Sequence, residues 1–222
     1  TGTAAHLICE WGLNEGKWPS EFPDHHPTPY IDVDGNHIEI DDDLISGPKL
    51  YCETIWEDIQ ELEDEHLDEG MIFVEEQVSI NDIFENGDIQ KLIDFVDENM
   101  VVPVSANKLS KEIPTCDAYY AWFINEMFNM FGTNDASYLI PGVILCVYDY
   151  KNGRWPVEVE NNTQFLYYAL GAAFAHDWNF EEVEMVVVQP NDMQNEEKVR
   201  RWRITKDELR AWIPIFRQAA LD

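Results

Sequence analysis

Basic residues are scarce in this sequence, and so are cysteines. Only 14 lysines and arginines stand against 44 aspartates and glutamates, which leaves a formal net charge of −30. Such a charge repels nucleic acids and other polyanions unless the bases gather in one region. The four cysteines form no CxxC pair, which argues against a zinc ribbon and a disulfide framework, so we interpret them as reduced packing residues.

Long apolar runs are also missing. No run approaches the roughly 20 residues that a membrane span needs, and the start carries no charged-then-apolar signal. We therefore expect a soluble, cytoplasmic protein without a membrane partner. The 222 residues, 45% of them hydrophobic, are enough for one globular domain, and a start at Thr1 rather than methionine is consistent with a fragment of a longer protein.

The few basic residues are unevenly placed. Residues 1–148 hold 31 acids and 5 bases, whereas residues 149–222 hold 13 acids and 9 bases, including every arginine. An anionic substrate should therefore meet the C-terminal third of the chain. The acidity elsewhere can also reflect a saline environment or a need for solubility, and it then says nothing about partners.

The hydrophobic pattern predicts an α/β chain. Helices are expected at 1–13 with Thr3 as candidate N-cap, at 53–70, at 161–176, and at 207–220 after a capping box at 205–208. Strands are expected at 71–80, in a hairpin over 135–149 that turns near Gly142, at 183–189 and at 199–204.

Two acidic insertions are expected outside this core. The first covers about 16–70, where 16–48 is rich in proline, aspartate and glycine and reads as an irregular excursion. The second covers about 81–130 and has helical patterns near 89–99 and 118–131. The acidic stretch from Glu53 to Glu69 is expected to be a solvated helix face, and the sharper alternative is that it screens a groove or mimics DNA.

The hairpin brings three candidate catalytic residues together. Asp135 and Asp149 are equidistant from Gly142, so they should lie opposite each other with Cα atoms about 4.5 to 5.5 Å apart. Lys151 follows Asp149 by two, which places both on one face of the strand. Two acids and a lysine on one face suit phosphodiester hydrolysis with a divalent cation, because the carboxylates hold the ion and the ammonium offsets charge in the transition state.

Several motifs resemble a known superfamily. GTNDA (132–136), DYK (149–151) and QFLYY (164–168), in this order, resemble the PD-(D/E)XK nucleases, and most closely a phage-borne, exonuclease-like group of the RecB-like branch. GTAAH near the start, VEEQV in a strand and RRWRITKDELRAW near the end are similar to the same group. The resemblance implies an α/β restriction-endonuclease-like core, with a central mixed sheet flanked by helices, within a single domain over 1–222.

The resemblance also implies roles for individual residues. Asp135 and Asp149 match the metal-binding acids, Lys151 the catalytic lysine, and His6 a further metal ligand. Gln164 and Tyr168 match a pair that lines the substrate groove, and their i, i+4 spacing gives them one helical face in any case. Weaker metal candidates are Glu10 and Glu76, and candidate phosphate contacts are Arg201 and Arg203, which alternation places on the face opposite Arg200.

Two competing candidates remain open. Asp117, in a second imitation of the GTxDA motif, is the alternative first acid, but Asp135 is preferred because it lies one hairpin from Asp149. His25 and His26 suggest a zinc site, yet no further ligands are spaced to complete it, so a solvated loop is the better interpretation.

The resulting expectation is a Mg²⁺- or Mn²⁺-dependent DNA nuclease, more consistent with an exonuclease than an endonuclease. An imidazole ligand makes Mn²⁺ at least as plausible as Mg²⁺. The partner would be DNA, in phage recombination or replication within the host cytoplasm. The competing class is a catalytically silent protein that keeps the nuclease fold and uses its acidic surface for interactions.

Overall fold

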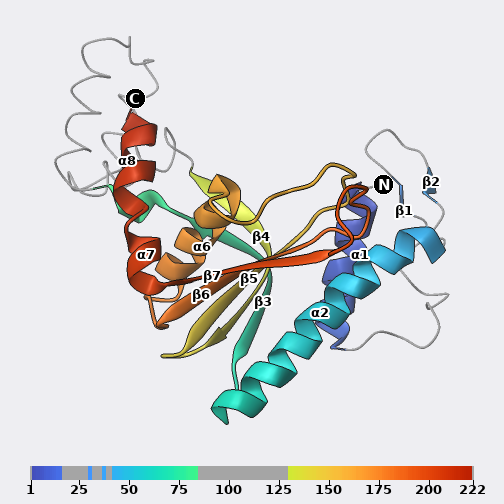
Figure 1. Ribbon diagram of the computed structural model, residues 1–222, viewed down its shortest axis with the longest axis horizontal. Coiled ribbons are helices and arrows are strands. Elements are labelled where there is room, and N and C mark those ends of the chain that lie inside the picture. The colour runs from blue at the N-terminus through green and yellow to red at the C-terminus, as the bar shows by residue number, and fades with distance from the viewer. Residues whose placement is uncertain (1, 17–29, 32–36, 39–41, 85–129, 222) are drawn as a thin grey trace, which may run out of the picture.

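The computed structural model describes residues 2–16, 30–31, 37–38, 42–84 and 130–221, which are drawn as coloured ribbon in Figure 1. The helices of this part are α1 (Gly2–Glu15), α2 (Asp42–His66), α6 (Thr163–Ala175), α7 (Lys206–Arg210) and α8 (Ile213–Leu221), with a 3-10 turn η1 (Asn81–Ile83). The strands are β1 (Tyr30–Ile31), β2 (His37–Ile38), β3 (Met71–Ser79), β4 (Phe131–Ile140), β5 (Ile144–Tyr150), β6 (Glu182–Val188) and β7 (Val199–Thr205).

Five strands form the central sheet in the order β3-β4-β5-β6-β7. The sheet is mixed, because β5 and β6 are parallel whereas the other neighbours are antiparallel. The predicted hairpin is confirmed: Ile140 pairs with Ile144 across a turn at Gly142, whose φ of 75° suits glycine. A parallel pair needs a crossover, and α6 supplies it between β5 and β6.

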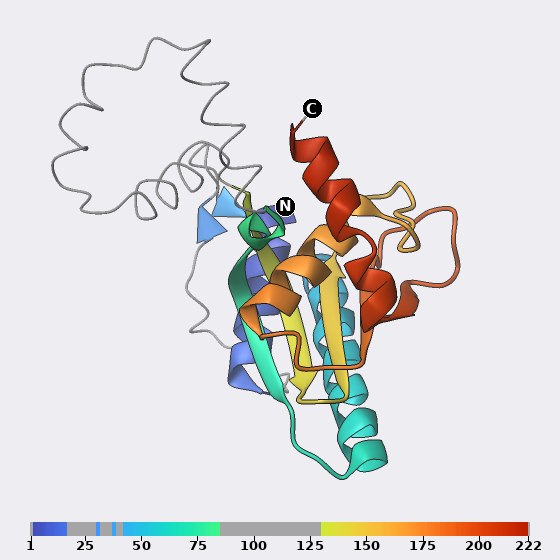
Figure 2. The same ribbon diagram turned by 90° about the vertical axis from the view of Figure 1, so that its left-hand side faces the viewer.

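Helices cover both faces of the sheet. On one face, α6 contributes Phe165 and Leu170 to a core that also includes Leu209 of α7. On the other face, α1 and α2 pack against the sheet through Cys9 and Tyr51, among others. Figure 2 shows the sheet between α6 and the α1–α2 pair. The fold is therefore an α/β sandwich with a mixed sheet flanked by helices, consistent with a restriction-endonuclease-like core.

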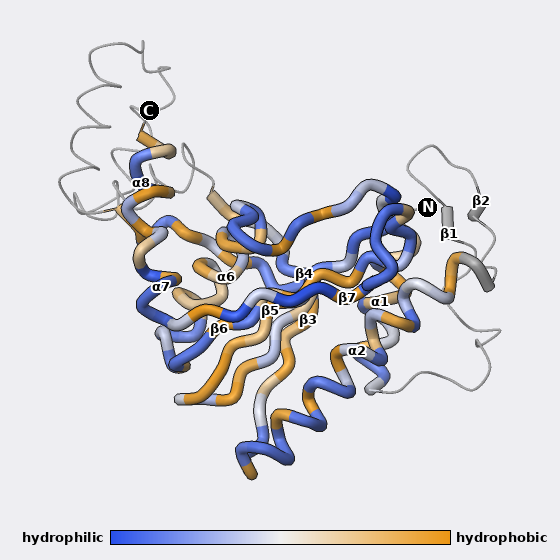
Figure 3. The backbone as a smooth tube through the Cα atoms, viewed as in Figure 1, coloured by the Kyte–Doolittle hydropathy of each residue, from blue (hydrophilic) through white to orange (hydrophobic). Residues whose placement is uncertain are grey.

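The central strands are apolar because they are covered on both faces. All seven residues of β5 are buried, and so are six of the seven in β6. Figure 3 shows these strands as largely hydrophobic, whereas α2 alternates between hydrophobic and hydrophilic residues. Four acids of α2 are exposed, as expected for a solvated face, namely Glu57, Glu61, Asp64 and Glu65, while Tyr51 and Ile55 are fully buried. Two others turn toward the sheet, because Asp58 pairs with Arg201 and Glu63 accepts from the Tyr138 hydroxyl.

Helix α2 corrects the prediction for 16–70. It begins at Asp42 rather than Glu53, and Pro48 lies inside it, where it forgoes one backbone hydrogen bond. Its buried face packs against β5, so this part of the predicted insertion belongs to a core layer. Gly47 makes the approach possible, because a Cβ there would stand 2.3 Å from the Tyr150 hydroxyl. Proline and surface acids hid this buried face in the sequence.

Both chain ends of the described part differ in detail from the prediction. Gly2 is already helical, so Thr3 is not the N-cap of α1. The capping box is confirmed, with Thr205 and Glu208 bonded reciprocally, but the last helix breaks into α7 and α8. Pro214 explains the break, because its ring blocks a continuous helix yet is tolerated in the first turn of a new one.

The other predictions are tested only in part. Cys9, Cys52 and Cys146 are buried and free, as expected for packing residues. No helix in the described segments is long and apolar enough to cross a membrane. Several predictions lie outside the described residues, namely His25, His26, Cys116, Asp117, the helix near 89–99 and positions 118–129 of the second helix. The last residue predicted for that second helix, Phe131, instead begins strand β4.

Candidate functional site

Strands β3 and β4 interrupt their pairing at Glu75 and Asp135. Val74 pairs with Ala136 and Glu76 with Asn134, while the two acids between them are unpaired in this ladder. Glu75 has a φ of 52°, a left-handed conformation that is uncommon for a non-glycine residue. Such irregularities redirect side chains and are enriched beside functional sites.

The interruption changes which way β3 presents its side chains. Before Glu75, Phe73 packs on the α6 side and Val74 on the α1–α2 side. After Glu75, Val78 packs on the α6 side, although regular alternation from Val74 would place it on the other. Because of this break, the Glu75 carboxylate lies outside the ladder and close to His6 of α1.

His6 of α1 completes a cluster with Glu75 and Asp135. Its Nδ1 lies 3.5 Å from Oδ2 of Asp135, and one ligand atom from each of the three residues lies within 4.8 Å of the others. The His6 ring also stands edge-on to Tyr150, with centroids 5.4 Å apart. Three elements distant in sequence therefore gather one imidazole and two carboxylates, which we call the acid cluster.

The acid cluster has an excess of negative charge. The hydrogen bond with Asp135 raises the pKa of His6 against the opposing effect of burial. Burial raises the pKa of Glu75, and the charges of Asp135 and Glu10 add to it. Glu10, a weaker candidate from the sequence, thus lies near the cluster without joining its ligand group. Groups in this arrangement are stabilised by a cation.

Asp149 and Lys151 lie beside the acid cluster as an ion pair. The Lys151 Nζ is 3.0 Å from Oδ1 and 2.8 Å from Oδ2 of Asp149, which confirms that the strand places both on one side. Burial, followed by the charge of Asp135, raises the pKa of Asp149 to about 6, while Lys151 opposes the shift. The backbone N–H of Tyr150, between them, donates to Asp135 Oδ2 at 2.8 Å.

The acid cluster and the predicted metal-ligand set of His6, Asp135 and Asp149 share two residues, and the metal role of Asp149 stays a prediction. The structure brings Glu75 together with His6 and Asp135, whereas the Asp149 oxygens are held by Lys151. Sequence reasoning missed Glu75. The only available signal was the pair of adjacent acids in VEEQV, which puts one acid on each face without saying which faces the site.

Glu76, the weaker candidate, lies on the opposite side of the sheet. Its Oε2 is 3.1 Å from Nε2 of His176, at the end of α6, and Phe73 stacks on the same histidine with centroids 4.1 Å apart. Glu76 therefore has a structural partner of its own and is not a member of the acid cluster.

Gln164 and Tyr168 share one face of α6, as predicted. The Gln164 amide donates to the Tyr168 hydroxyl at 3.1 Å. The Tyr168 ring lies over Gly132 of β4, where a Cβ would come within 3.0 Å of its Cε1. Gly132 precedes Asp135 by three residues, so the pair contacts the strand that carries the cluster, from the α6 side.

Arg201 and Arg203 point to acidic partners rather than to the acid cluster. Arg201 binds both carboxylate oxygens of Asp58, at 2.7 and 2.8 Å, and also Glu184 at 3.1 Å. Arg203 binds Glu184 through Nε at 3.1 Å. Arg200 faces the other way and pairs with Asp192, as alternation predicted. The predicted phosphate contacts are thus occupied by carboxylates, which sequence alone could not show because Asp58 comes from α2.

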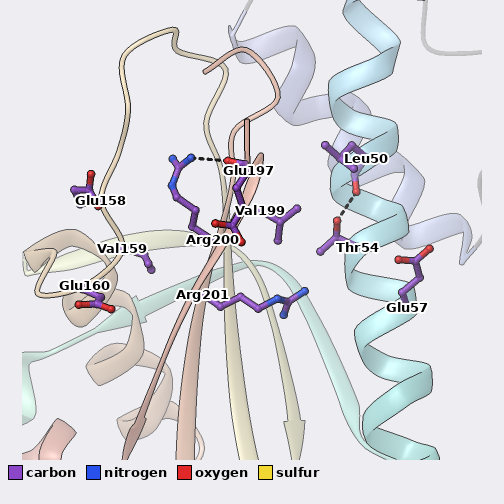
Figure 4. Close-up of a pocket in the computed structure, with 10 residues that line it drawn as sticks. All are labelled: Leu50, Thr54, Glu57, Glu158, Val159, Glu160, Glu197, Val199, Arg200 and Arg201. Atoms are coloured by element: carbon purple, nitrogen blue, oxygen red, sulfur yellow. Dashed lines mark hydrogen bonds between the residues drawn. The ribbon is translucent and has the colours of Figure 1, made fainter. Parts of the chain in front are cut away.

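A polar cavity of about 540 Å³ lies between α2, the start of β7 and the loop before α6 (Figure 4). Arg200 and Arg201 line it together with four glutamates, Glu57, Glu158, Glu160 and Glu197. None of its lining residues belongs to the acid cluster. Because its arginines already have partners and its glutamates repel anions, the cavity is a poor site for phosphate.

Comparison with known proteins gives one match. Residues 120–219 match the model of a family described as "Protein of unknown function (DUF2800)". No curated protein and no solved structure matches the chain. The matched span includes Asp135, Asp149, Lys151, Gln164 and Tyr168, but its description names no activity. The function must therefore be argued from the site.

Proposed function

We propose that this protein is a divalent-metal-dependent nuclease that hydrolyses phosphodiester bonds in DNA. The observation that supports it is the acid cluster of His6, Glu75 and Asp135 beside the Asp149–Lys151 pair. The acid cluster offers metal ligands, and the Asp149–Lys151 pair offers an ammonium next to a carboxylate. This combination of groups is what metal-assisted phosphodiester hydrolysis requires.

The acid cluster fits a divalent cation. Carboxylate oxygens suit Mg²⁺ and Mn²⁺, and an imidazole ligand shifts the preference toward Mn²⁺. The Tyr150 N–H holds Asp135 in place, as an outer hydrogen bond does for a ligating carboxylate. Glu75 and Asp135 lie close together, so binding a cation relieves the repulsion between their carboxylates.

The chain's own residues have distinct roles in this proposal. His6, Glu75 and Asp135 would hold the cation, which supplies Lewis-acid polarisation of the phosphate and activates water for attack. Lys151 presents its ammonium where negative charge develops on the phosphate. Asp149 keeps that ammonium in position through contacts of 2.8 and 3.0 Å. Asp149 itself is buried, with only 3% of its surface exposed.

The preference for DNA and for exonucleolytic cleavage rests on the resemblance. Gln164 and Tyr168 would line the substrate groove from α6, where their mutual hydrogen bond fixes both side chains. A role in phage recombination or replication follows the same resemblance.

The experiment is cleavage of end-labelled single- and double-stranded DNA with Mn²⁺, Mg²⁺ or EDTA. Lys151→Ala should abolish metal-dependent cleavage because it removes the ammonium from the site. Lys206→Ala is the matched control, since Lys206 pairs with Glu181 at 2.8 Å and has no contact with the acid cluster. Equal loss in both variants, or full activity of Lys151→Ala, would count against the proposal.

The exposed acids of α2 favour a second candidate function, that of a silent interaction protein. Glu57, Glu61, Asp64 and Glu65 are all exposed on this helix. Such a face attracts basic partners and repels DNA. Absence of cleavage with every metal, together with salt-sensitive binding of a basic protein, would favour this candidate over the nuclease.

A further inference from the structure

The loop after β5 carries a prominent exposed aromatic residue. Trp155 is 78% exposed, whereas the other five described tryptophans are at least half-buried. Met193, in the loop after β6, is 76% exposed. Both views show the two loops at the end of the sheet where α1 begins (Figures 1 and 2).

Hydrogen bonds pin this exposed loop. Gln189 is fully buried, and its amide donates to the backbone carbonyls of Gly153 at 2.9 Å and Trp155 at 2.6 Å. Its oxygen accepts from the Val157 N–H at 3.0 Å. The Met193 N–H donates to the Arg154 carbonyl at 3.2 Å. The loop is therefore held in one shape that leaves the indole in solvent.

Arg154, beside Trp155, differs from four other arginines of the described residues. Arg200, Arg201, Arg203 and Arg210 each form an ion pair with a carboxylate. Arg154 is exposed, and no acid among the described residues lies within ion-pair distance of it. In a chain with a net charge of −30, a cation without an acidic partner is available for an external anion.

The position of the loop connects it to the candidate site. Trp155 follows Lys151 by four residues, so their Cα atoms are at most about 14 Å apart. A nucleic acid whose phosphate lies at Lys151 would bring neighbouring nucleotides within reach of this loop. An indole can stack on any base, but only on a base that is not paired, and a guanidinium can bind the adjoining phosphate.

We infer that Arg154 and Trp155 form a substrate contact, with Trp155 stacked on an unpaired base and Arg154 on a phosphate, which assigns single-stranded DNA as the preferred substrate. This inference rests on the proposed function and extends it. It also relocates the phosphate contact from Arg201 and Arg203, which are held by carboxylates, to an arginine that has no acidic partner in the described part of the chain.

The test measures binding of a labelled single-stranded oligonucleotide and a blunt duplex by fluorescence anisotropy, in EDTA at low salt so that cleavage does not interfere. Trp155→Ala should weaken single-strand binding by about tenfold and duplex binding far less. Arg154→Ala should weaken both and reduce the slope of log affinity against log salt by about one. The matched controls are Leu67→Ala, which removes a 90% exposed apolar residue directly after α2, and Arg210→Ala.

A strand with abasic sites isolates the stacking. If Trp155 stacks on bases, Trp155→Ala and wild type should bind the abasic strand equally. Single-strand binding of Trp155→Ala equal to that of Leu67→Ala would overturn the inference, even if DNA is cleaved. If Trp155→Ala selectively loses single-strand binding but the wild type shows no metal-dependent cleavage, the substrate contact is supported and the proposed nuclease activity is refuted.

Discussion

The Asp135 carboxylate accepts a hydrogen bond from the backbone N–H of Tyr150 at 2.8 Å. This bond crosses from β4 to β5 just beyond the last regular pair, Ala136 with Tyr148, so a side chain replaces the next backbone contact. The same oxygen lies 3.5 Å from His6. One carboxylate thus links the acid cluster to the backbone segment that carries Asp149 and Lys151.

Replacement of Asp149 by Asn should change how stability depends on pH. Burial and Asp135 raise the pKa of Asp149 from 3.8 to about 6. In metal-free protein, the folded state then keeps a proton that the unfolded state releases, so the wild type loses stability as pH rises from about 4 to about 6. Asp149→Asn has no carboxyl group at this position and therefore lacks this loss.

The measurement is urea unfolding of both proteins in EDTA across this pH range. The free energy of unfolding of Asp149→Asn minus that of the wild type should increase as pH rises. The variant should also lack cleavage. A difference between the two proteins that is independent of pH would contradict the raised pKa.

Replacement of Asp135 by Asn should lower the pKa of His6. The hydrogen bond with Asp135 is the largest cause that raises the His6 pKa above 6.5, and an amide cannot supply the charge that favours imidazolium. The pair stabilises the fold below the unfolded pKa, and this contribution is lost as pH rises through the folded pKa. NMR titration of the His6 ring in the metal-free wild type and variant measures the shift. An unchanged His6 pKa in the variant would show that Asp135 is not its partner.

Gln189 should be important for stability although it is remote from the acid cluster. Its side chain makes four hydrogen bonds while fully buried, to Gly153, Trp155, Val157 and Arg200. Gln189→Ala leaves several of these buried groups without a partner, so unfolding should cost about 2 kcal/mol less. Gln164→Ala, at an exposed position, should change stability by no more than about 0.5 kcal/mol. Chemical denaturation compares the two, and equal small effects would contradict a pinned loop.

Much of the fold was predictable because local signals fix it. The turn at Gly142 sets the hairpin register, which runs to the pair of Ala136 and Tyr148, and Asp135 and Asp149 follow directly beyond that pair. The capping box at Thr205 fixes the start of α7. These features depend on residues close in sequence, where turn and cap chemistry is specific.

The remainder depends on contacts between distant segments. Glu75 enters the acid cluster through an irregular backbone conformation within β3, which alternation cannot reveal. Arg201 is occupied by Asp58, a residue 143 positions away. The exposure of Trp155 results from Gln189, which pins its loop from the next strand. In each case the role of a side chain depends on a partner whose position in space cannot be predicted from the sequence.

The central claim is that His6, Glu75 and Asp135 form a metal site, and Mn²⁺ titration by calorimetry of Glu75→Gln and Glu76→Gln tests it most directly. The two acids are adjacent in sequence and have the same charge, but only Glu75 belongs to the acid cluster. The account predicts that Glu76→Gln binds Mn²⁺ like the wild type and that Glu75→Gln binds at least about tenfold more weakly. Equal affinity in both variants, or no Mn²⁺ binding by the wild type, would contradict it.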